Sequence, residues 1–321
     1  MKLVVQIPAF NEEKTIARVI SGIPKKIPGI KEVKVLVIND GSKDRTFQEA
    51  QKAGADKIFS HDSNKGLGVA FRNGINEALK MGADIIVNID GDMQFNPKDI
   101  PKLAEPILKG EADLVTCTRF KEKHREPKMP LIKKFGNKVF TKIISWLAKQ
   151  KFTDTQCGFR AYSKECALHL TLFGKHTYTQ EALLDAIQKG FIVKEVSCEV
   201  RGERQFGKSK VVENWFSYSL KALLIITRTI RDNKPLQFFG SIGVALFLMG
   251  ALSAFWLWVR LLLRHKIDPY AWIVYADVIF MVLGFLLIIL ALIADMNARQ
   301  RKITEEILYR QKKQEIEKAN N

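Results

Sequence analysis

The side chains best suited to chemistry follow the apolar run 85–89, where Asp90, Asp92 and Gln94 occupy alternate positions. A short apolar run of this kind predicts a strand that is buried on both faces. If the chain stays extended, side chains two residues apart point to the same side, so these three would converge. Their oxygen atoms suit Mg²⁺ or Mn²⁺, with water and substrate phosphates completing the coordination. An acidic surface turn is the alternative interpretation.

Two earlier strands, predicted at 2–7 and 33–38, also end in polar residues. Ligands of open α/β sheets bind at the carboxyl ends of the strands. Glu12 would hydrogen-bond a ribose or a base there, or serve only as a negative charge at a helix N-terminus. Asp40 is placed to accept an N–H bond from a base. No GxGxxG motif follows the first strand, which argues against a dinucleotide site.

Cationic residues mark three further segments. Lys65 lies beside two glycines at the start of a predicted helix, a setting that suits a pyrophosphate. Arg119 follows the predicted fifth strand, and Asp154 is the only carboxylate of the polar segment 153–160. The segment 201–210 holds four cations, two glycines and a serine. That composition favours phosphate binding over a merely solvated charge run.

Strands and helices alternate up to Arg119, which predicts an α/β domain with a mostly parallel sheet. The regular alternation then stops at a basic loop, 120–130. An amphipathic helix is predicted at 131–149, suited to a core or to a membrane surface. One more helix at 179–189 and a strand at 192–196 complete the domain.

The net charge of +17 lies mostly before residue 236. A basic domain beside a membrane indicates anionic partners, namely lipid head groups, phosphorylated substrates or nucleic acid. The four cysteines show no CxxC spacing, so reduced thiols are expected. The five histidines form no HExxH motif, and no signal peptide is expected.

Two apolar segments, at 238–259 and 269–294, are long enough to span a bilayer. Asp277 is the only charge in the second segment and is expected at a membrane interface. Lys and Arg are more frequent outside the two segments than between them, which places both chain ends in the cytosol of a multi-pass cell-membrane protein.

The predicted organisation is thus an α/β domain at 1–210, an amphipathic juxtamembrane helix at 211–235, a transmembrane hairpin at 236–296 and a charged tail at 297–321. The tail is expected to be a helix that is exposed to solvent or self-associating.

Several of these segments match motifs of one family. The chain resembles the polyprenyl- or dolichyl-phosphate glycosyltransferases, family-2 enzymes of GT-A fold that include the dolichyl-phosphate mannose and glucose synthases. The resemblance covers residues 1–235. The matching motifs are Pro8-Ala9-Phe10-Asn11-Glu12, Asn39-Asp40-Gly41-Ser42-x-Asp44-x-Thr46, Asn64-Lys65-Gly66, Asp90-Gly91-Asp92-x-Gln94, Arg119-Phe120, Asp154-Thr155-Gln156-Cys157-Gly158-Phe159 and Arg204-x-x-Gly207-x-Ser209-Lys210.

The resemblance implies a GT-A, Rossmann-like catalytic domain followed by two transmembrane helices and, in some relatives, a tetramer. It assigns nucleotide binding to Pro8, Ala9, Asn11, Glu12, Asp40, Lys65 and Asp90. It assigns the metal, Mg²⁺ or Mn²⁺, to Asp90, Asp92 and Gln94. It assigns the acceptor phosphate to Arg119, Arg204, Ser209 and Lys210, and catalytic roles to Asp92, Asp154 and Arg204.

The implied reaction is an inverting, metal-dependent transfer of a sugar from a nucleotide sugar to a polyprenyl or dolichyl phosphate at the cytosolic membrane face. The residues of the 154–159 motif resemble those of the glucose-type synthases more than those of the mannose-type ones. The resemblance therefore favours a UDP-hexose such as UDP-glucose or UDP-GlcNAc over GDP-mannose. Asp154 would orient a substrate or act as a base, and both roles stay open.

Two other interpretations use the same features. A processive polysaccharide synthase shares the fold, but it usually carries a Gln-x-x-Arg-Trp motif and more membrane helices, which this sequence lacks. A membrane-tethered nucleotide- or nucleic-acid-binding protein would use the basic charge but leave the grouping of Asp90, Asp92 and Gln94 unexplained. We therefore expect a nucleotide sugar, a lipid phosphate and the bilayer as partners, and no nucleic acid.

Overall fold

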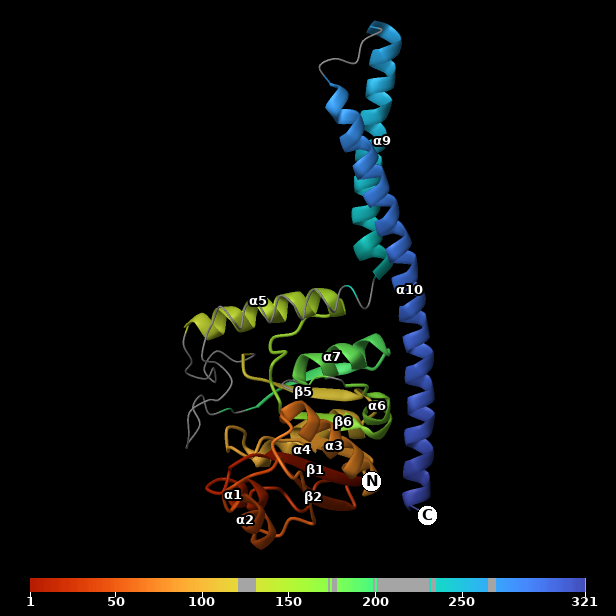
Figure 1. Cartoon of the computed structure of the whole chain (residues 1–321). Helices are drawn as coiled ribbons and strands as arrows, with labels where there is room; N and C mark the ends of the chain where they lie inside the picture. Colours follow the sequence, from red (N-terminus) through yellow and green to blue (C-terminus); the bar gives the residue numbers. More distant parts are fainter. Residues whose placement is uncertain are drawn as a thin grey trace. The chain divides into compact units, whose positions relative to one another are not determined.

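The computed structural model describes residues 1–120, 131–172, 174, 178–198, 200, 231, 235–264 and 270–320. The chain forms two compact units. Unit 1 consists of Met1–Glu213 and Leu308–Asn321, and unit 2 consists of Asn214–Ile307. Figure 1 labels several of their helices and strands.

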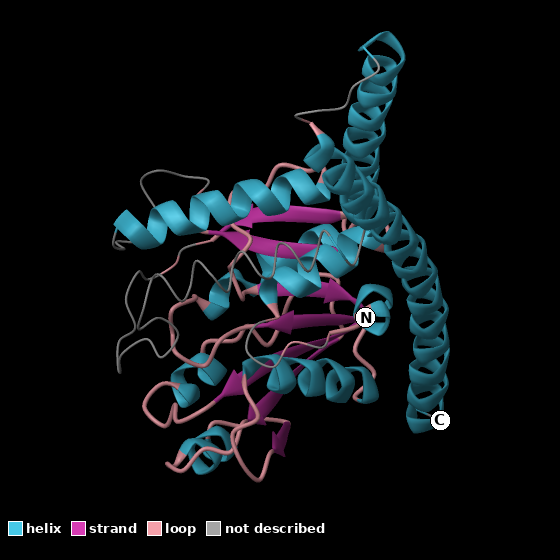
Figure 2. Ribbon diagram, turned by 45° about the horizontal axis from the view of Figure 1, so that its top comes forward, coloured by secondary structure: helices cyan, strands magenta, loops and turns pink. Residues whose placement is uncertain are grey.

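Within the described residues, unit 1 contains a seven-stranded sheet, drawn in magenta in Figure 2. Its strands are β1 (Lys2–Ala9), β2 (Glu32–Asn39), β3 (Lys57–Ser60), β4 (Ile85–Asn88), β5 (Leu114–Thr118), β6 (Arg160–Ser163) and β7 (Val193–Ser197). They lie in the order β3-β2-β1-β4-β6-β5-β7. All neighbours are parallel except β6, which runs antiparallel to β4 and β5. The expected mostly parallel sheet is confirmed.

Helices follow the strands in the expected alternation. They are α1 (Ile16–Ser21), α2 (Thr46–Lys52), α3 (Leu67–Lys80), the 3-10 helix η1 (Pro97–Asp99), α4 (Ile100–Leu108), α5 (Leu131–Ala148), α6 (Lys164–His169) and α7 (Thr179–Gln188). α3 packs against β1 and β2, whereas α4 packs against β5 and β6. The helices predicted at 131–149 and 179–189 are thus found as α5 and α7, and α6 is an addition.

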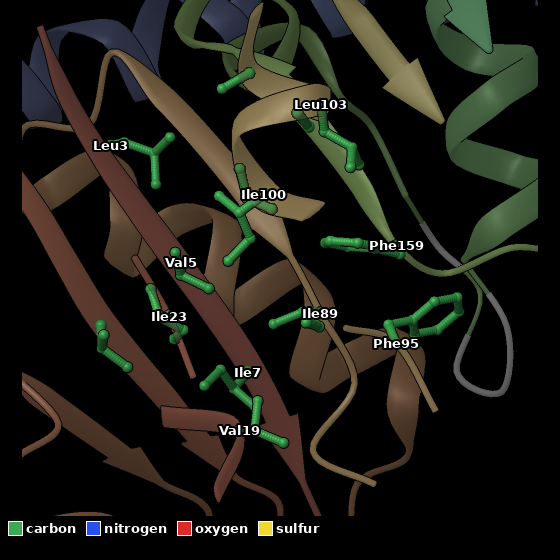
Figure 3. Packing of buried hydrophobic residues seen from close by; sticks show 14 of the residues in the cluster. Leu3, Val5, Ile7, Val19, Ile23, Ile89, Phe95, Ile100, Leu103 and Phe159 are labelled. Carbon is green, nitrogen blue, oxygen red and sulfur yellow. The ribbon is translucent and has the colours of Figure 1, made fainter. Parts of the chain in front are cut away.

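Both faces of β1 are buried. Leu3, Val5 and Ile7 belong to one apolar cluster with Ile100 and Leu103 of α4 (Figure 3). The apolar pattern of the strand therefore reflects a sheet covered by helices. A ligand must then bind at the loops beyond the carboxyl ends of the strands.

The opposite face of β1 carries a buried polar contact. The Nε2 of Gln6 donates to Oδ1 of Asn88 on β4 at 2.9 Å. α3 approaches this contact so closely that a Cβ on Gly74 would lie 2.4 Å from Oε1 of Gln6. A larger residue at position 74 would therefore force the Gln6 side chain to shift.

The sequence pattern does not predict β6, because a charged residue, Arg160, opens it. Arg160 is fully buried. Its guanidinium donates to Oγ1 of Thr116 at 3.2 Å, to the carbonyl oxygen of Thr155 at 3.0 Å and to the carbonyl oxygen of Thr179. These acceptors replace water, so the charge is tolerated inside the domain. Two of these partners lie 44 and 19 positions away in the chain, so local hydrophobic periodicity gives no sign of them.

Unit 2 contains α9 (Pro235–Arg264) and the larger part of α10 (Ala271–Asn320), both long and apolar enough to cross a membrane. A Cβ on Gly284 would lie 2.7 Å from the carbonyl oxygen of Gly243, so the two helices touch at their backbones. Asp277, expected at a membrane interface, is buried against α9, where the Ser253 hydroxyl donates to its Oδ1. Small residues and polar pairs of this kind are typical of packed membrane helices.

The last part of α10 belongs to unit 1. The hydroxyl of Tyr309 donates to Oε1 of Glu165 on α6 at 2.8 Å, and its ring stacks on His169 with centroids 3.8 Å apart. Nζ of Lys312 donates to the carbonyl oxygen of Leu170 at 3.0 Å. The tail is helical as expected. Most of its described side chains are exposed, while Tyr309 and Lys312 contact α6 and the residue that follows it.

Replacing Gly284 with alanine should destabilise the hairpin, since the added methyl group would lie 2.5 Å from the backbone nitrogen of Phe247. Gly240→Ala is the matched control, because its methyl group would meet only side chains at 3.8 Å or beyond. Alanine also favours a helix over glycine by about 1 kcal/mol. Thermal unfolding in detergent should give a lower Tm for Gly284→Ala and an unchanged or higher Tm for Gly240→Ala. Equal Tm values would contradict the close packing.

Candidate active site

Asp90, Asp92 and Gln94 lie in a turn after β4. The strand ends at Asn88, Met93 has a left-handed φ of 62°, and the Gln94 N–H donates to Oδ1 of Asp92 at 3.0 Å. The expectation of an extended segment is therefore wrong. An aspartate that accepts a bond from the amide two residues on favours a turn over a strand. Asp92 is buried, and Asp90 is half-buried.

Gly158 lies against this turn. A Cβ on Gly158 would stand 2.9 Å from the hydroxyl of Tyr178 and 3.3 Å from Oδ2 of Asp90. Nδ2 of Asn88 donates to the Gly158 carbonyl oxygen at 2.9 Å and to the Tyr178 hydroxyl at 2.7 Å. Burial raises the pKa of Tyr178 well above its ordinary value, and the nearby charge of Asp90 adds to the shift. Tyr178 therefore keeps its proton, which it donates to the Gly158 carbonyl oxygen at 3.2 Å.

The loops that follow β1 and β2 are held to each other by hydrogen bonds. The Asn11 N–H donates to Oγ of Ser42 at 3.0 Å, and Oδ1 of Asn11 accepts from the Lys43 N–H at 2.9 Å. Asn11 has a φ of 55°, a conformation that asparagine tolerates better than most residues. These contacts fix the chain directly after Pro8 and Ala9, the last residues of β1.

Glu12 contacts the start of α1, one of the two roles considered for it. Its N–H donates to Oγ1 of Thr46 at 2.8 Å. Its Oε2 accepts from the hydroxyl of Thr15 at 3.0 Å, directly before the first residue of the helix. The residue thus joins the exit of β1 to the start of α2.

The carboxylate of Asp40 organises the loop before α3. It is 4% exposed and accepts N–H bonds from Lys65 at 2.9 Å and from Gly66 at 3.0 Å. Nδ1 of His61 lies 2.6 Å from its Oδ1, and Nε2 of His61 lies 2.8 Å from Nδ2 of Asn73. The side chain of Lys65 is exposed. His61 and Asn73 are missed by sequence reasoning because neither stands in a recognisable motif.

Arg119 and Asp154 form an ion pair shielded from water. Nε of Arg119 lies 2.5 Å from Oδ2 of Asp154, and Nη2 lies 2.9 Å from Oδ1. The side chain of Asp154 is fully buried, and that of Arg119 is 19% exposed. Burial lowers the pKa of Arg119, but the charge and hydrogen bonds of Asp154 outweigh it and raise the pKa overall. Both carboxylate oxygens of Asp154 thus hold the guanidinium of Arg119, and this two-point contact fixes the orientation of the Arg119 side chain.

The expected metal ligands and the described residues of the expected acceptor side form two groups in the structure. Asp90, Asp92 and Gln94 follow β4, and Arg119 pairs with Asp154 at the end of β5. The segment 154–158 connects the groups, since its last residue touches Asp90. Arg204, Ser209 and Lys210 lie outside the described residues, as do nearly all of the expected basic loop and juxtamembrane helix.

The donor atoms after β4 fit a hard divalent cation. Across the described ranges, no group of three or more His, Cys, Asp or Glu side chains is arranged to hold a metal ion. Asp90 and Asp92 supply two carboxylates and Gln94 an amide oxygen. That set leaves coordination positions for water and substrate phosphates, as Mg²⁺ commonly requires, and it contains no soft ligand.

Asp40→Asn should loosen the loop that carries Lys65 and Gly66. Asparagine offers one acceptor oxygen in place of two, so one amide loses its partner at a local cost of about 1–3 kcal/mol. Hydrogen–deuterium exchange read by mass spectrometry should be faster in the peptide spanning 64–68. Asp62→Asn is the control, because Asp62 is exposed. Equal exchange in the two variants would refute the role of Asp40.

Residues 4–170 match the family described as Glycosyl transferase family 2. A UDP-N-acetylglucosamine–dolichyl-phosphate N-acetylglucosaminyltransferase from Methanococcus voltae is 34% identical over 174 residues, covering 49% of this chain and 68% of the relative. The glycosyltransferase AglJ of Haloferax volcanii is 29% identical over 308 residues, covering 94% and 96%. A dolichol-phosphate mannosyltransferase from Pyrococcus furiosus is 29% identical over 218 residues, covering 66% and 59%.

Solved structures share the fold. Glucosyl-3-phosphoglycerate synthase from Mycobacterium tuberculosis, in complex with Mn²⁺, UDP and glucosyl-3-phosphoglycerate, is 23% identical with a TM-score of 0.51, covering 74% of this chain and 79% of that one. Its complex with phosphoglyceric acid gives a TM-score of 0.55 at 22% identity, covering 70% and 79%. This likeness confirms the expected GT-A fold. Because the family match spans more than half of the chain, the protein belongs to glycosyl transferase family 2.

Proposed function

We propose that this protein transfers a sugar from a nucleotide sugar to a polyprenyl or dolichyl phosphate. The observation that carries the proposal is the link between two charged groups. Asp154 holds Arg119, and Gly158 of the same segment stands against Asp90. A cation suited to one phosphate is thereby tied to carboxylates suited to a metal and a diphosphate.

The relatives support a lipid phosphate as acceptor. The relative from Methanococcus voltae is named as a dolichyl-phosphate N-acetylglucosaminyltransferase, and the one from Pyrococcus furiosus as a dolichol-phosphate mannosyltransferase. A third, from Pectobacterium carotovorum, is named as an undecaprenyl-phosphate 4-deoxy-4-formamido-L-arabinose transferase and is 26% identical over 258 residues, covering 78% of this chain and 73% of the relative. We favour a UDP-hexose such as UDP-GlcNAc or UDP-glucose as donor, with GDP-mannose as the second choice.

The donor would bind beyond the carboxyl ends of β1, β2 and β4. Its nucleotide would contact Pro8, Ala9, Asn11, Glu12, Asp40, Lys65 and Asp90. Mg²⁺ or Mn²⁺ would be held by Asp90, Asp92 and Gln94. When bound, the cation neutralises the charge that develops on the departing diphosphate.

In the proposed reaction, an oxygen of the acceptor phosphate attacks the anomeric carbon from the face opposite the diphosphate. The bond from that carbon to the diphosphate oxygen breaks, the nucleoside diphosphate leaves with the electron pair, and the configuration is inverted. The acceptor is already anionic at neutral pH, so it needs no strong base. Arg119 would offset the repulsion between the two anionic substrates. Arg204, Ser209 and Lys210 would complete the acceptor site.

A lipid acceptor requires a site close to a bilayer. α9 and α10 would cross it, with both chain ends on the cytosolic side. α5 also supports a bilayer close to the site. Its Trp146 is 70% exposed and lies one turn from the exposed Lys142. Exposed tryptophan beside lysine is typical of helices at the surface of anionic membranes. A homo-oligomer such as a tetramer is part of the proposal.

Asp92→Ala should abolish transfer while the protein stays folded, because a metal carboxylate is lost. Membranes would be incubated with a polyprenyl phosphate and each radiolabelled UDP- or GDP-sugar, and label extracted into organic solvent would be counted. EDTA should remove wild-type transfer, and Mg²⁺ or Mn²⁺ should restore it.

Undiminished turnover by Asp92→Ala would refute the assignment of Asp92 to the metal. Asp62→Asn is the control and should keep wild-type turnover, because Asp62 is exposed. If no donor labels the lipid with either metal, lipid glycosylation is wrong. Salt-sensitive DNA binding by such an inactive protein would then favour the nucleic-acid-binding alternative.

Arg119→Gln should raise the KM for the lipid acceptor about tenfold or more, since it removes a charged hydrogen-bond donor from the phosphate. The KM for the donor should change by less than about twofold, because the nucleotide contacts lie on other strands. Lys109→Gln is the control, an exposed cation that pairs with Glu105 at 2.6 Å. A larger effect on the donor than on the acceptor would refute the assignment.

A further inference from the structure

Glu195 on β7 holds the backbone of the segment that carries Asp154. The Thr153 N–H lies 2.9 Å from each of its carboxylate oxygens. The Thr153 hydroxyl donates to Oε2 at 3.0 Å, and the Asp154 N–H donates to Oε1 at 3.0 Å. Three donors from two consecutive residues thus converge on one carboxylate.

The same two residues are tied to the end of β5. Oγ1 of Thr153 lies 2.5 Å from Oγ1 of Thr118. Asp154 holds the side chain of Arg119, and the Arg119 N–H points to Oδ2 of Asp154 at 3.4 Å. β7 pairs with β5, with Glu195 opposite Thr116. Glu195, the 153–154 segment and the residues after β5 therefore form one continuous network.

We propose that Glu195 is a positioning residue for Arg119: it fixes Thr153 and Asp154, and Asp154 in turn fixes the direction of the guanidinium. That the guanidinium faces an acceptor phosphate rests on the proposed function, whereas the positioning does not.

The electrostatics of Glu195 support this role. Burial raises its pKa in spite of the hydrogen bonds from Asp154 and Thr153, and the charge of Asp154 adds to the shift. The carboxylate is therefore held where ionisation is unfavourable, unlike a glutamate that is merely solvated. Both of its oxygens are used, so a glutamine should replace it only in part.

Glu195→Ala and Glu195→Gln test the proposal in the full-length protein. Glu111→Gln is the matched control, because Glu111 binds Lys194, the neighbour of Glu195 on β7, in an exposed ion pair at 2.8 Å. Hydrogen–deuterium exchange is the first measurement, since it needs no activity. In Glu195→Ala, the amides of Thr153, Asp154 and Arg119 should all exchange about tenfold faster, the factor expected for a lost hydrogen bond to a charged group.

Glu195→Gln should give an intermediate exchange rate, and Glu111→Gln should match wild type. Faster exchange at 153–154 with an unchanged Arg119 amide would overturn the proposal, because the network would then end at Asp154. If the alanine variant does not fold, the same comparison is made with glutamine.

Kinetics then test the consequence for the acceptor. Glu195→Ala should raise the KM for polyprenyl phosphate about tenfold and leave the donor KM within about twofold of wild type, with the glutamine variant in between. An unchanged acceptor KM beside a faster-exchanging Arg119 amide would refute the assignment of Arg119 to the acceptor phosphate and would support its positioning by Glu195. A wild-type protein that glycosylates no polyprenyl phosphate would refute the proposed function instead, and the exchange of the Arg119 amide would still decide the positioning role.

Discussion

A carboxylate without access to water must be surrounded by donors or it will not stay charged. Asp154 meets this requirement with the guanidinium of Arg119, the N–H of Gln156 and a backbone held in place by Glu195. Loss of the guanidinium would leave a buried charge uncompensated. The segment around Asp154 therefore has few other arrangements that would satisfy this buried carboxylate, and its hydrogen bonds orient the candidate acceptor side of the site.

The antiparallel strand β6 explains why that segment lies at the active edge of the sheet. Parallel strands β4 and β5 end at this edge, and an antiparallel strand between them must begin there. The pairing of Asn88 with Arg160 shows the arrangement, since the last residue of β4 faces the first residue of β6. Residues 154–159, directly before β6, consequently lie at the ends of β4 and β5, next to Asp90 and Arg119. The reversal of one strand brings distant parts of the chain into one site.

Much of this could be predicted from the sequence, because apolar runs and turn residues act locally. The parallel sheet, the alternating helices and the segment containing Asp90 and Asp92 follow from such patterns. The conformation of that segment does not follow from them. The sequence pattern predicts an extended chain, whereas the structure has a turn in which the Gln94 N–H donates to Asp92. Strand β6 was not predicted because it opens with the charged Arg160, and two of the three acceptors of Arg160 lie 44 and 19 positions away in the chain. Glu195 was invisible for the same reason, as its partners are some forty positions away.

Gly158 joins the two halves of the site through its backbone, since a Cβ there would lie 2.9 Å from the hydroxyl of Tyr178 and 3.3 Å from Oδ2 of Asp90. This close backbone contact has a thermodynamic consequence. If a ligand at the turn after β4 shifts Gly158, the shift reaches Asp154 and Arg119, and the affinity of a second ligand there changes by some factor. Linkage requires that the second ligand change the affinity of the first by the same factor. The donor and the acceptor would then bind cooperatively, coupled through the backbone of Gly158.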